Sequence, residues 1–306
     1  MWLAHVIAIS LPTMTEPTAS QLRSAHLQRL LPKQMLTRLA GRMANWHAGW
    51  LTTRFIAWFV QRYNVDMTQA AESNIHTYKS FNDFFTRALK DGARPLADTA
   101  LVCPADGIVS QFGPIQQNQI LQAKRHHYTV SALLGCKKDD PLAQAFCDGA
   151  FATIYLSPRD YHRVHMPCDG RLLSMTHIPG NLFSVNPATA ATIPELFARN
   201  ERVVCLFESE ELGRFALVLV GATIVGSIGT VWHGIVNTTR NGQLQHIDYQ
   251  GPDAPTLKKG EEMGRFQLGS TVVLVYEPGR VEFEAGWEAG MPVQMGQAMG
   301  TTPNLR

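Results

Sequence analysis

Three short segments of the chain carry residue types that can perform chemistry. The segment 104–107, Pro-Ala-Asp-Gly, places an acid in a turn that leads into an apolar run. The segment 161–167, Tyr-His-Arg-Val-His-Met-Pro, holds two histidines, and the segment 259–271 ends in Leu-Gly-Ser-Thr directly before an apolar run. Together they supply an acid, a base and a hydroxyl, the residue types of nucleophilic catalysis by an oriented base.

Each segment also has a purely structural interpretation. An Asp-Gly pair is common turn chemistry, and a Gly-Ser pair before a strand is typical of a hairpin or bulge. One surface histidine and one buried, hydrogen-bonded histidine would explain the 161–167 segment as well as catalysis does. Spacing alone does not select which Asp, His and Ser act together.

The two histidines are predicted to have different roles. Pro158 and Pro167 flank them and argue against a helix. In an extended segment, residues three apart point to opposite faces, so His162 and His165 are not expected to chelate one metal ion together. We therefore expect no metal site here.

The Gly269-Ser270 bond is the candidate for self-cleavage. A glycine before a serine leaves its carbonyl open to attack and tolerates unusual backbone angles. A Ser270 hydroxyl activated by a histidine and an aspartate could attack its own peptide bond. Asp106, His165 and Ser270 provide these types.

Two basic helices are predicted ahead of these segments. Apolar residues recur at helical spacing through residues 35–46 and again through residues 51–59. The segment 17–65 holds seven basic and no acidic residues, so it carries +7 and leaves −5 for the rest of a chain whose total is +2. Three tryptophans lie among these basic residues: Trp46, Trp50 and Trp58. This composition favours helices lying in a membrane interface, and a helical cap with solvated arginines is the alternative.

A β-rich body is predicted after the helices. A third helix is expected over Ser80–Leu89, with Ser80 as its cap. Short β-rich runs then follow, punctuated by Gly and Pro, at residues 108–115, 151–156, 202–208, 215–228, 270–277 and 281–285. The pattern predicts an α+β chain whose body is a mainly antiparallel sandwich or barrel-like structure rather than a parallel sheet.

Composition excludes several other classes. The 306 residues, 45% of them hydrophobic, suffice for a real core, and the small net charge does not point to nucleic acid. Five scattered cysteines without a C-x-x-C pair indicate free thiols in a reduced compartment. The apolar residues 1–12 are too short to span a bilayer and lack the features of a signal peptide.

Seven segments of the chain, in the same order, resemble motifs of one enzyme family, the pyruvoyl-dependent phosphatidylserine decarboxylases. The resemblance is to their proteobacterial membrane-associated branch in particular. The segments are residues 81–96, 104–107, 156–170, 181–190, 196–204, 220–228 and 259–271. The resemblance extends upstream through residues 31–52, so it covers nearly everything from Gln28 to Tyr276. Residues after Glu277 and the first twenty match weakly.

The resemblance implies a proenzyme that cleaves itself. The cut would fall between Gly269 and Ser270, giving a β chain of residues 1–269 and an α chain of residues 270–306. The family's relay falls on Asp106, His165 and Ser270: His165, oriented by Asp106, takes the Ser270 proton while the serine oxygen attacks the Gly269 carbonyl. Elimination and hydrolysis then release ammonia and convert Ser270 into a pyruvoyl group.

The resemblance also implies the reaction of the mature enzyme. The pyruvoyl ketone forms a Schiff base with the amine of phosphatidylserine, CO2 departs, and phosphatidylethanolamine is released without pyridoxal phosphate or metal. His162 is the candidate proton donor or carboxylate contact. Leu182 and Phe183 are candidates to line the substrate entrance, and core packing is an equal alternative for them.

We expect a weakly assigned extension at residues 1–20, a basic helical membrane-associating region at 21–95 and a β-rich catalytic domain at 96–306. The expected partners are an anionic phospholipid membrane, bound peripherally at the cytoplasmic face of the cell membrane, and a second copy in a homodimer. Three alternatives remain. They are a related decarboxylase acting on another serine-headgroup lipid or a soluble amine precursor, a carrier or phosphotransfer domain using His162 or His165, and an inactive membrane-binding relative.

Overall fold

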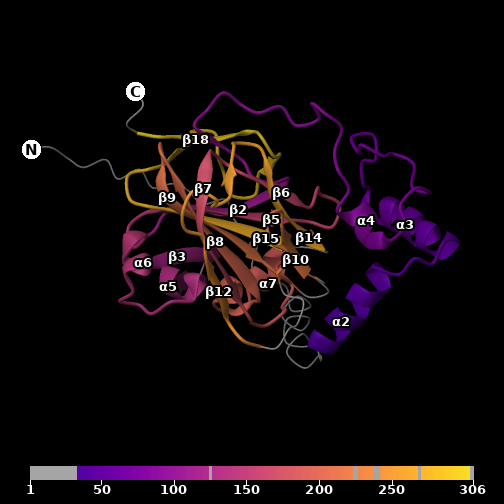
Figure 1. The fold of residues 1–306 in the computed structure, drawn as a ribbon, viewed down its shortest axis with the longest axis horizontal. Coiled ribbons are helices and arrows are strands. Elements are labelled where there is room, and N and C mark those ends of the chain that lie inside the picture. The colour runs from indigo at the N-terminus through magenta and orange to yellow at the C-terminus, as the bar shows by residue number, and fades with distance from the viewer. Residues whose placement is uncertain (1–32, 124–125, 223–226, 237–241, 268–269, 304–306) are drawn as a thin grey trace, which may run out of the picture.

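The computed structural model describes residues 33–123, 126–222, 227–236, 242–267 and 270–303. A helical part, made of α2 (Lys33–Ala44), α3 (Trp50–Tyr63) and α4 (Phe81–Phe85), lies to one side of a β-rich body (Figure 1). The two basic helices predicted from apolar spacing are thereby confirmed. The predicted extension at residues 1–20, and the part of the basic region before Lys33, lie outside the described residues.

Helix α4 begins as predicted but ends earlier. The Ser80 hydroxyl accepts a hydrogen bond from Asp83 N, and the Asp83 carboxylate accepts one from Ser80 N, both at 3.1 Å, which forms a capping box. The predicted helix ran to Leu89, but the structure has it end at Phe85. The reason is tertiary, because Leu89 instead forms an antiparallel bridge with Ala70.

The body is built on antiparallel sheets. The largest has the strand order β12 (Gln245–Asp248), β7 (Gly170–Ile178), β8 (Arg202–Ser209), β9 (Gly213–Val220), β15 (Ser270–Tyr276), β5 (Ala150–Leu156), β2 (Gly107–Pro114) and β17 (Pro292–Val293), with β13 (Thr256–Leu257) also paired to β7. A second has the order β11 (Gly234–Ile235), β10 (Ser227–Thr230), β14 (Glu262–Gln267) and β6 (Arg163–His165). A third has the order β1 (Leu101–Val102), β18 (Ala298–Thr301) and β16 (Glu282–Phe283). The β-rich, mainly antiparallel body is confirmed, but across the described ranges the large sheet stays open and does not close into a barrel.

Several short elements were not predicted. The hairpin of β3 (Gln119–Ala123) and β4 (His126–Thr129) is one of them, and the others are the helices α5 (Val130–Leu134), α6 (Pro141–Ala145), α7 (Pro187–Ala190) and α8 (Leu196–Arg199). Helices of four or five residues are too short to show a 3.6-residue period. The predicted run 215–228 is divided between β9 and β10, which belong to different sheets.

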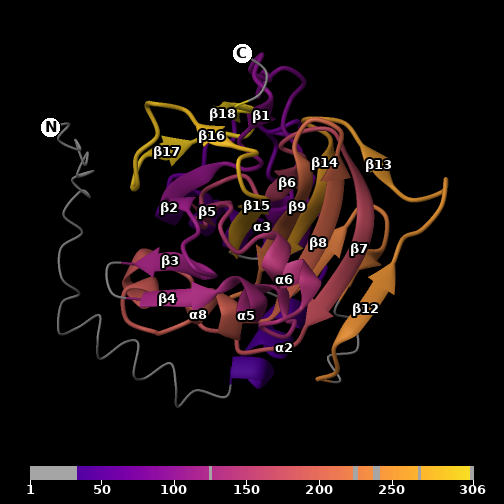
Figure 2. The same cartoon turned by 90° about the vertical axis from the view of Figure 1, so that its left-hand side faces the viewer.

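Two hydrophobic cores cover the two faces of the large sheet. Along β15, Val272 and Leu274 point into one core, whereas Val273 and Val275 point into the other. The first core also contains side chains from the second and third sheets, and the second contains side chains from β3, β4, α5 and α8. Figure 2 shows this hairpin and these helices on one side of the large sheet, with β16 and β18 on the other.

The helical part offers no membrane-spanning segment. Within the residues that the structure describes, no helix is both long and apolar enough to cross a bilayer. The five cysteines are all free thiols, as the sequence predicted.

Candidate active site

The backbone brings the three chemistry-bearing segments to one end of the large sheet. Ser270 begins β15 directly opposite Leu156, the last residue of β5, and β2 pairs with the other side of β5. β6 lies against the turn before β2, because His165 N donates a hydrogen bond to the Pro104 carbonyl at 2.8 Å. Residues more than 100 positions apart in the sequence therefore share one corner of the fold.

The Ser270 side chain lies inside the protein. It is fully buried, and its hydroxyl has no hydrogen-bond partner among the described residues. The alternation along β15 places Ser270 on the same face as Val272, the face that packs on the second sheet. A buried hydroxyl without a partner is costly and calls for a functional explanation. Gly269, the predicted donor of the attacked carbonyl, lies outside the described residues.

Asp106 is a buried carboxylate held by Arg94. Arg94 Nε donates to Asp106 Oδ1 at 2.9 Å, and the Arg94 Nη2 group pairs with Oδ2. The backbone N–H of Met295 donates to Oδ1 at 2.9 Å. The bond to Asp106 raises the pKa of Arg94 above its ordinary value. The carboxylate is thus fully occupied by these donors, and no hydrogen bond joins it to His165 in the described part of the chain.

His165 is oriented by a backbone carbonyl. Its Nδ1 lies 2.8 Å from the Gly260 oxygen, which can only accept, so Nδ1 carries the proton and Nε2 carries the lone pair. Tyr161, 3.0 Å away, donates its hydroxyl to that lone pair. Burial lowers the pKa of His165 and raises that of Tyr161 to about 12. His165 is therefore a neutral imidazole whose basic nitrogen is presented to a neighbouring hydroxyl.

His162 has different neighbours from His165 and is more deeply buried. Its Nδ1 donates to the Asp160 carbonyl at 2.8 Å, and its Nε2 has no partner in the ranges described. The ring lies against Phe85, with 4.0 Å between the centroids. Burial, together with the nearby Arg87 cation, lowers the pKa of His162 to about 3. The two histidines have different partners and both are neutral, and that they have different roles stays a prediction.

Four residues that contact the candidate groups were not predicted from the sequence: Arg94, Tyr161, Gly260 and Phe85. Tyr161 adjoins the first histidine, so its position alone could have suggested a role. Nothing local marks Arg94 or Gly260, because each meets its partner only through the fold.

Leu182 and Phe183 lie in the interior, and both are almost fully buried. The segment is braced by Asn200, whose Oδ1 accepts from Phe183 N at 3.1 Å while its Nδ2 donates to the carbonyls of Phe183 and Gly221 at 2.9 Å. Gly221 directly follows β9, the strand beside β15. Phe183 belongs to the second core, so its packing role is established and a substrate contact stays a prediction.

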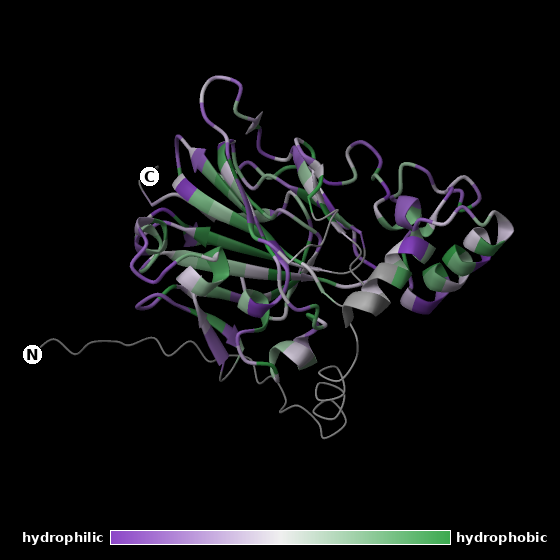
Figure 3. Ribbon diagram, turned by 60° about the horizontal axis from the view of Figure 1, so that its bottom comes forward, coloured by the Kyte–Doolittle hydropathy of each residue, from purple (hydrophilic) through white to green (hydrophobic). Residues whose placement is uncertain are grey.

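An apolar groove of about 600 Å3 lies within the helical part and borders the body. Residues of α2, α3 and α4 line it, together with Pro158 from the loop that precedes His162. Large apolar side chains of α2, α3 and the loop between them are exposed in the same region: Leu39, Met43, Trp46, Trp50, Leu51, Phe55 and Trp58. Figure 3 shows apolar and polar segments alternating along these helices. The groove reaches the site because Phe85 lines it and also contacts His162.

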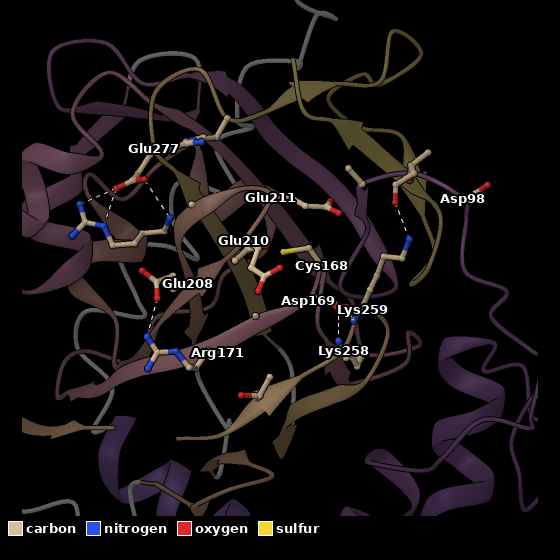
Figure 4. A pocket seen from close by; sticks show the side chains of 18 residues that line it. Asp98, Cys168, Asp169, Arg171, Glu208, Glu210, Glu211, Lys258, Lys259 and Glu277 are labelled. Carbon is tan, nitrogen blue, oxygen red and sulfur yellow. Dashed lines mark hydrogen bonds and ion pairs between the residues drawn. The ribbon is translucent and has the colours of Figure 1, made fainter. Parts of the chain in front are cut away.

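A larger cavity, of about 1100 Å3, lies at the other end of the sheet (Figure 4). Its lining includes Glu277, which directly follows β15 and so lies a full strand length from Ser270. Its charges largely satisfy one another, as in the pairs Arg171–Glu208 and Lys258–Asp169. None of the predicted site residues lines it. No group of side chains suited to a metal ion occurs within the described residues.

Comparison with known proteins gives a consistent picture. The profile of the phosphatidylserine decarboxylase family matches residues 81–301, and a second profile, described as PSD, matches residues 24–64. A protein of Acidovorax ebreus is 64% identical over 272 residues, which cover 89% of this chain and 95% of that protein. Proteins of Methylobacillus flagellatus and Chromobacterium violaceum are each 60% identical, over 277 and 274 residues, covering 90% of this chain and 98% and 97% of theirs. All three are named phosphatidylserine decarboxylase proenzyme.

Proposed function

The chain belongs to the phosphatidylserine decarboxylase family, and on this premise we propose that it is a proenzyme that cleaves itself before Ser270 and then converts phosphatidylserine to phosphatidylethanolamine and CO2. One observation carries the assignment of the site. The Ser270 hydroxyl is fully buried and unpartnered at the first residue of β15, where the family's cleavage motif falls. A serine kept only for structure would be expected to have a hydrogen-bond partner in such a place.

His165 is the proposed base for cleavage. Its Nε2 carries a lone pair because Gly260 fixes the proton on Nδ1. In the cleavage step, Nε2 accepts the Ser270 proton while the serine oxygen bonds to the Gly269 carbonyl carbon, and the amide becomes an ester. In this structure the Tyr161 hydroxyl is hydrogen-bonded to Nε2. That bond has to break before the Ser270 hydroxyl can donate to the same nitrogen in the reacting geometry.

Asp106 is proposed to act through the surrounding field rather than by direct contact. The bond from His165 N to the Pro104 carbonyl brings the loop that carries Asp106 close to the imidazole. Burial lowers the pKa of His165, and the carboxylates of Glu262 and, more weakly, Asp106 oppose that lowering. An imidazolium that forms at His165 during cleavage would be stabilised by the negative charge of Asp106. Arg94 and Met295 N hold the carboxylate in place for this role.

The residues around position 270 fit a pyruvoyl group. A pyruvoyl at the start of β15 would have a methyl group where Ser270 has an unpartnered hydroxymethyl, and its ketone oxygen would take the place of the Ser270 amide nitrogen, so no side-chain hydrogen bond of Ser270 among the described residues would be lost. Once formed, this group supplies an electrophilic ketone that binds the substrate amine and withdraws electrons as CO2 leaves.

His162 is the proposed proton carrier for turnover. Its Nε2 has no partner among the described residues, so this atom could carry a proton. Because burial lowers the pKa of His162 to about 3, the protonated ring would give its proton up readily to carbon but would not draw one from an ammonium group. Neutral His162 is less suited to pairing with the substrate carboxylate, so we favour the proton-carrying role.

The exposed face of α2 and α3 is proposed to lie on an anionic membrane at the cytoplasmic side. Trp50 is 72% exposed, and the other large apolar side chains of this face are also well exposed. Arg42, Arg54 and Arg62 lie on the same two helices, and each basic residue near an anionic surface adds about 1 kcal/mol of attraction. The apolar groove then provides a path from the bilayer to His162.

We also propose that the body is a β-sandwich, which the packing of the large sheet on the second sheet supports, and that the enzyme is a homodimer.

Purified protein tests cleavage directly. Wild-type chain should give two pieces on a denaturing gel, with masses that place the cut before Ser270, whereas Ser270→Ala should stay intact. Ser209→Ala, a buried serine at the far end of the sheet, is the matched control and should be cleaved normally. An intact wild-type chain with full decarboxylase activity would refute the proposal.

Vesicles and soluble serine derivatives test the substrate. Release of CO2 from phosphatidylserine vesicles, but not from free serine or from lipids with other headgroups, is expected. His162→Ala should be cleaved normally yet lose turnover. Phosphohistidine without cleavage would favour the phosphotransfer alternative.

A further inference from the structure

The ring of Phe85 contacts both the apolar groove and His162. Phe85 lines the apolar groove of the helical part, beside Phe59 and Phe81, and only 1% of it is exposed. Its ring also lies against His162, with 4.0 Å between the centroids and 42° between the planes. The small surface that Phe85 offers at the inner end of the groove therefore belongs to the same ring that contacts the candidate proton carrier.

The backbone on either side of this contact is tied to the histidine loop. Arg163 Nε donates to the Thr86 carbonyl at 2.8 Å, and Arg87 Nη2 approaches the Arg159 carbonyl at 3.4 Å. Arg163 directly follows His162, and Arg159 precedes it by three residues. Two hydrogen bonds therefore connect the segment after α4 to the loop that carries His162.

His162 is held by one side-chain hydrogen bond and by packing. In the described part of the chain its ring bonds only from Nδ1 to the Asp160 carbonyl, and because the side chain is fully buried, the contacts around it fix the rest of the ring. The position of Nε2, the atom that would carry the proton, then depends on the surface against which the ring rests. Phe85 provides that surface.

The groove suits an acyl chain. Its lining is almost wholly apolar, and its outer part is bordered by the exposed side chains Met43, Trp46 and Leu51. Its inner end is formed by Phe85 and Pro158, which adjoin the histidine loop. A substrate with two acyl chains that reacts near His162 must place those chains on an apolar surface close by, and this groove is contiguous with the site.

We propose that Phe85 is a positioning residue: an acyl chain in the groove packs on one side of its ring and holds the other side against His162, so that filling the groove increases turnover. This inference rests on the proposed decarboxylase function. It predicts that the acyl chains contribute to kcat and not only to binding, because a small displacement of a catalytic group can cost up to about 10²-fold in rate.

The test compares two substrates that share the same headgroup on the mature, cleaved enzyme. These are long-chain phosphatidylserine in detergent micelles and glycerophosphoserine, which has no acyl chains. Wild-type kcat should be about tenfold or more higher with the chains present. Phe85→Leu should lose most of this advantage with normal cleavage, so that its kcat values on the two substrates become nearly equal. Phe85→Tyr keeps the ring and should restore the wild-type pattern.

A matched control separates binding from positioning. Leu51→Ala removes groove surface that does not contact His162, so it should raise KM for the long-chain substrate and alter kcat little. Equal wild-type kcat on the two substrates, or a Phe85→Leu variant that behaves like Leu51→Ala, would overturn the inference while leaving the decarboxylase function intact. A wild-type enzyme that decarboxylates neither substrate would instead refute the proposed function.

Discussion

The Arg94–Asp106 pair gives the most direct test of the cleavage site. The family resemblance makes Asp106 a partner of His165, whereas the structure pairs it with Arg94. The proposed perturbations are Asp106→Asn and Arg94→Met, separately and together. Both are made in the Ser270→Ala chain, so that a single uncleaved polypeptide unfolds.

The magnitude follows from burial and contacts. The side chains of Arg94 and Asp106 are only 8% and 10% exposed, and the pair shares hydrogen bonds at both carboxylate oxygens. Removing one partner of such a buried pair leaves the other charge uncompensated, which costs about 3–5 kcal/mol. Arg94→Met also loses the bond from Nη1 to Gln69 at 2.6 Å, so it is expected at the upper end of that range. The double variant removes both charges and should cost less than the sum, by about 2–3 kcal/mol.

Urea unfolding of the four chains at pH 7, followed by circular dichroism, gives the coupling free energy. A coupling of at least about 1 kcal/mol supports the pairing. Strictly additive losses would refute it, because they would mean that Arg94 does not neutralise Asp106 in the folded chain. Repeating the single changes with Ser270 present then measures cleavage: if Asp106 acts through its charge, Asp106→Asn should slow self-cleavage even under conditions where it stays folded.

The remaining predictions concern pH, packing and the membrane. His162 has a pKa lowered by burial to about 3 from an ordinary value near 6.5, so below about pH 6.5 the unfolded chain binds a proton that the folded chain does not, and stability should fall as pH falls. Urea unfolding of Ser270→Ala between pH 7 and 5 should show this loss, and adding His162→Phe should flatten it by up to roughly 1.4 kcal/mol per pH unit; parallel slopes would contradict the assignment. Asn200→Leu removes the three hydrogen bonds from its side chain to buried backbone groups of Phe183 and Gly221 and should cost about 2–4 kcal/mol, whereas an unchanged urea midpoint would show that these bonds are dispensable. Trp50→Ala should reduce sedimentation with anionic vesicles without changing the urea midpoint, because this side chain is largely exposed; undiminished binding would remove Trp50 from the membrane face.

Local patterns were sufficient for much of the fold. Apolar spacing predicted α2 and α3, the Ser80 hydroxyl marked the start of α4, and β-branched runs marked β5, β8 and β15. These elements are long or carry a signal within a few residues. The end of α4 could not be read in this way, because it depends on a bridge between Leu89 and Ala70 that only the folded chain forms.

The candidate site likewise depends partly on local sequence and partly on the tertiary structure. The sequence by itself nominated Asp106, His162, His165 and Ser270 as candidates, since their residue types lie in local motifs and those motifs carry the family resemblance. Only the tertiary structure decided their states. Whether a carboxylate is occupied, which imidazole nitrogen carries the proton and whether a hydroxyl is left unpaired all depend on atoms from distant segments, here Arg94, Gly260 and Phe85. Hydrogen bonding and burial act through space, so a linear pattern can name the reacting groups but cannot state what surrounds them.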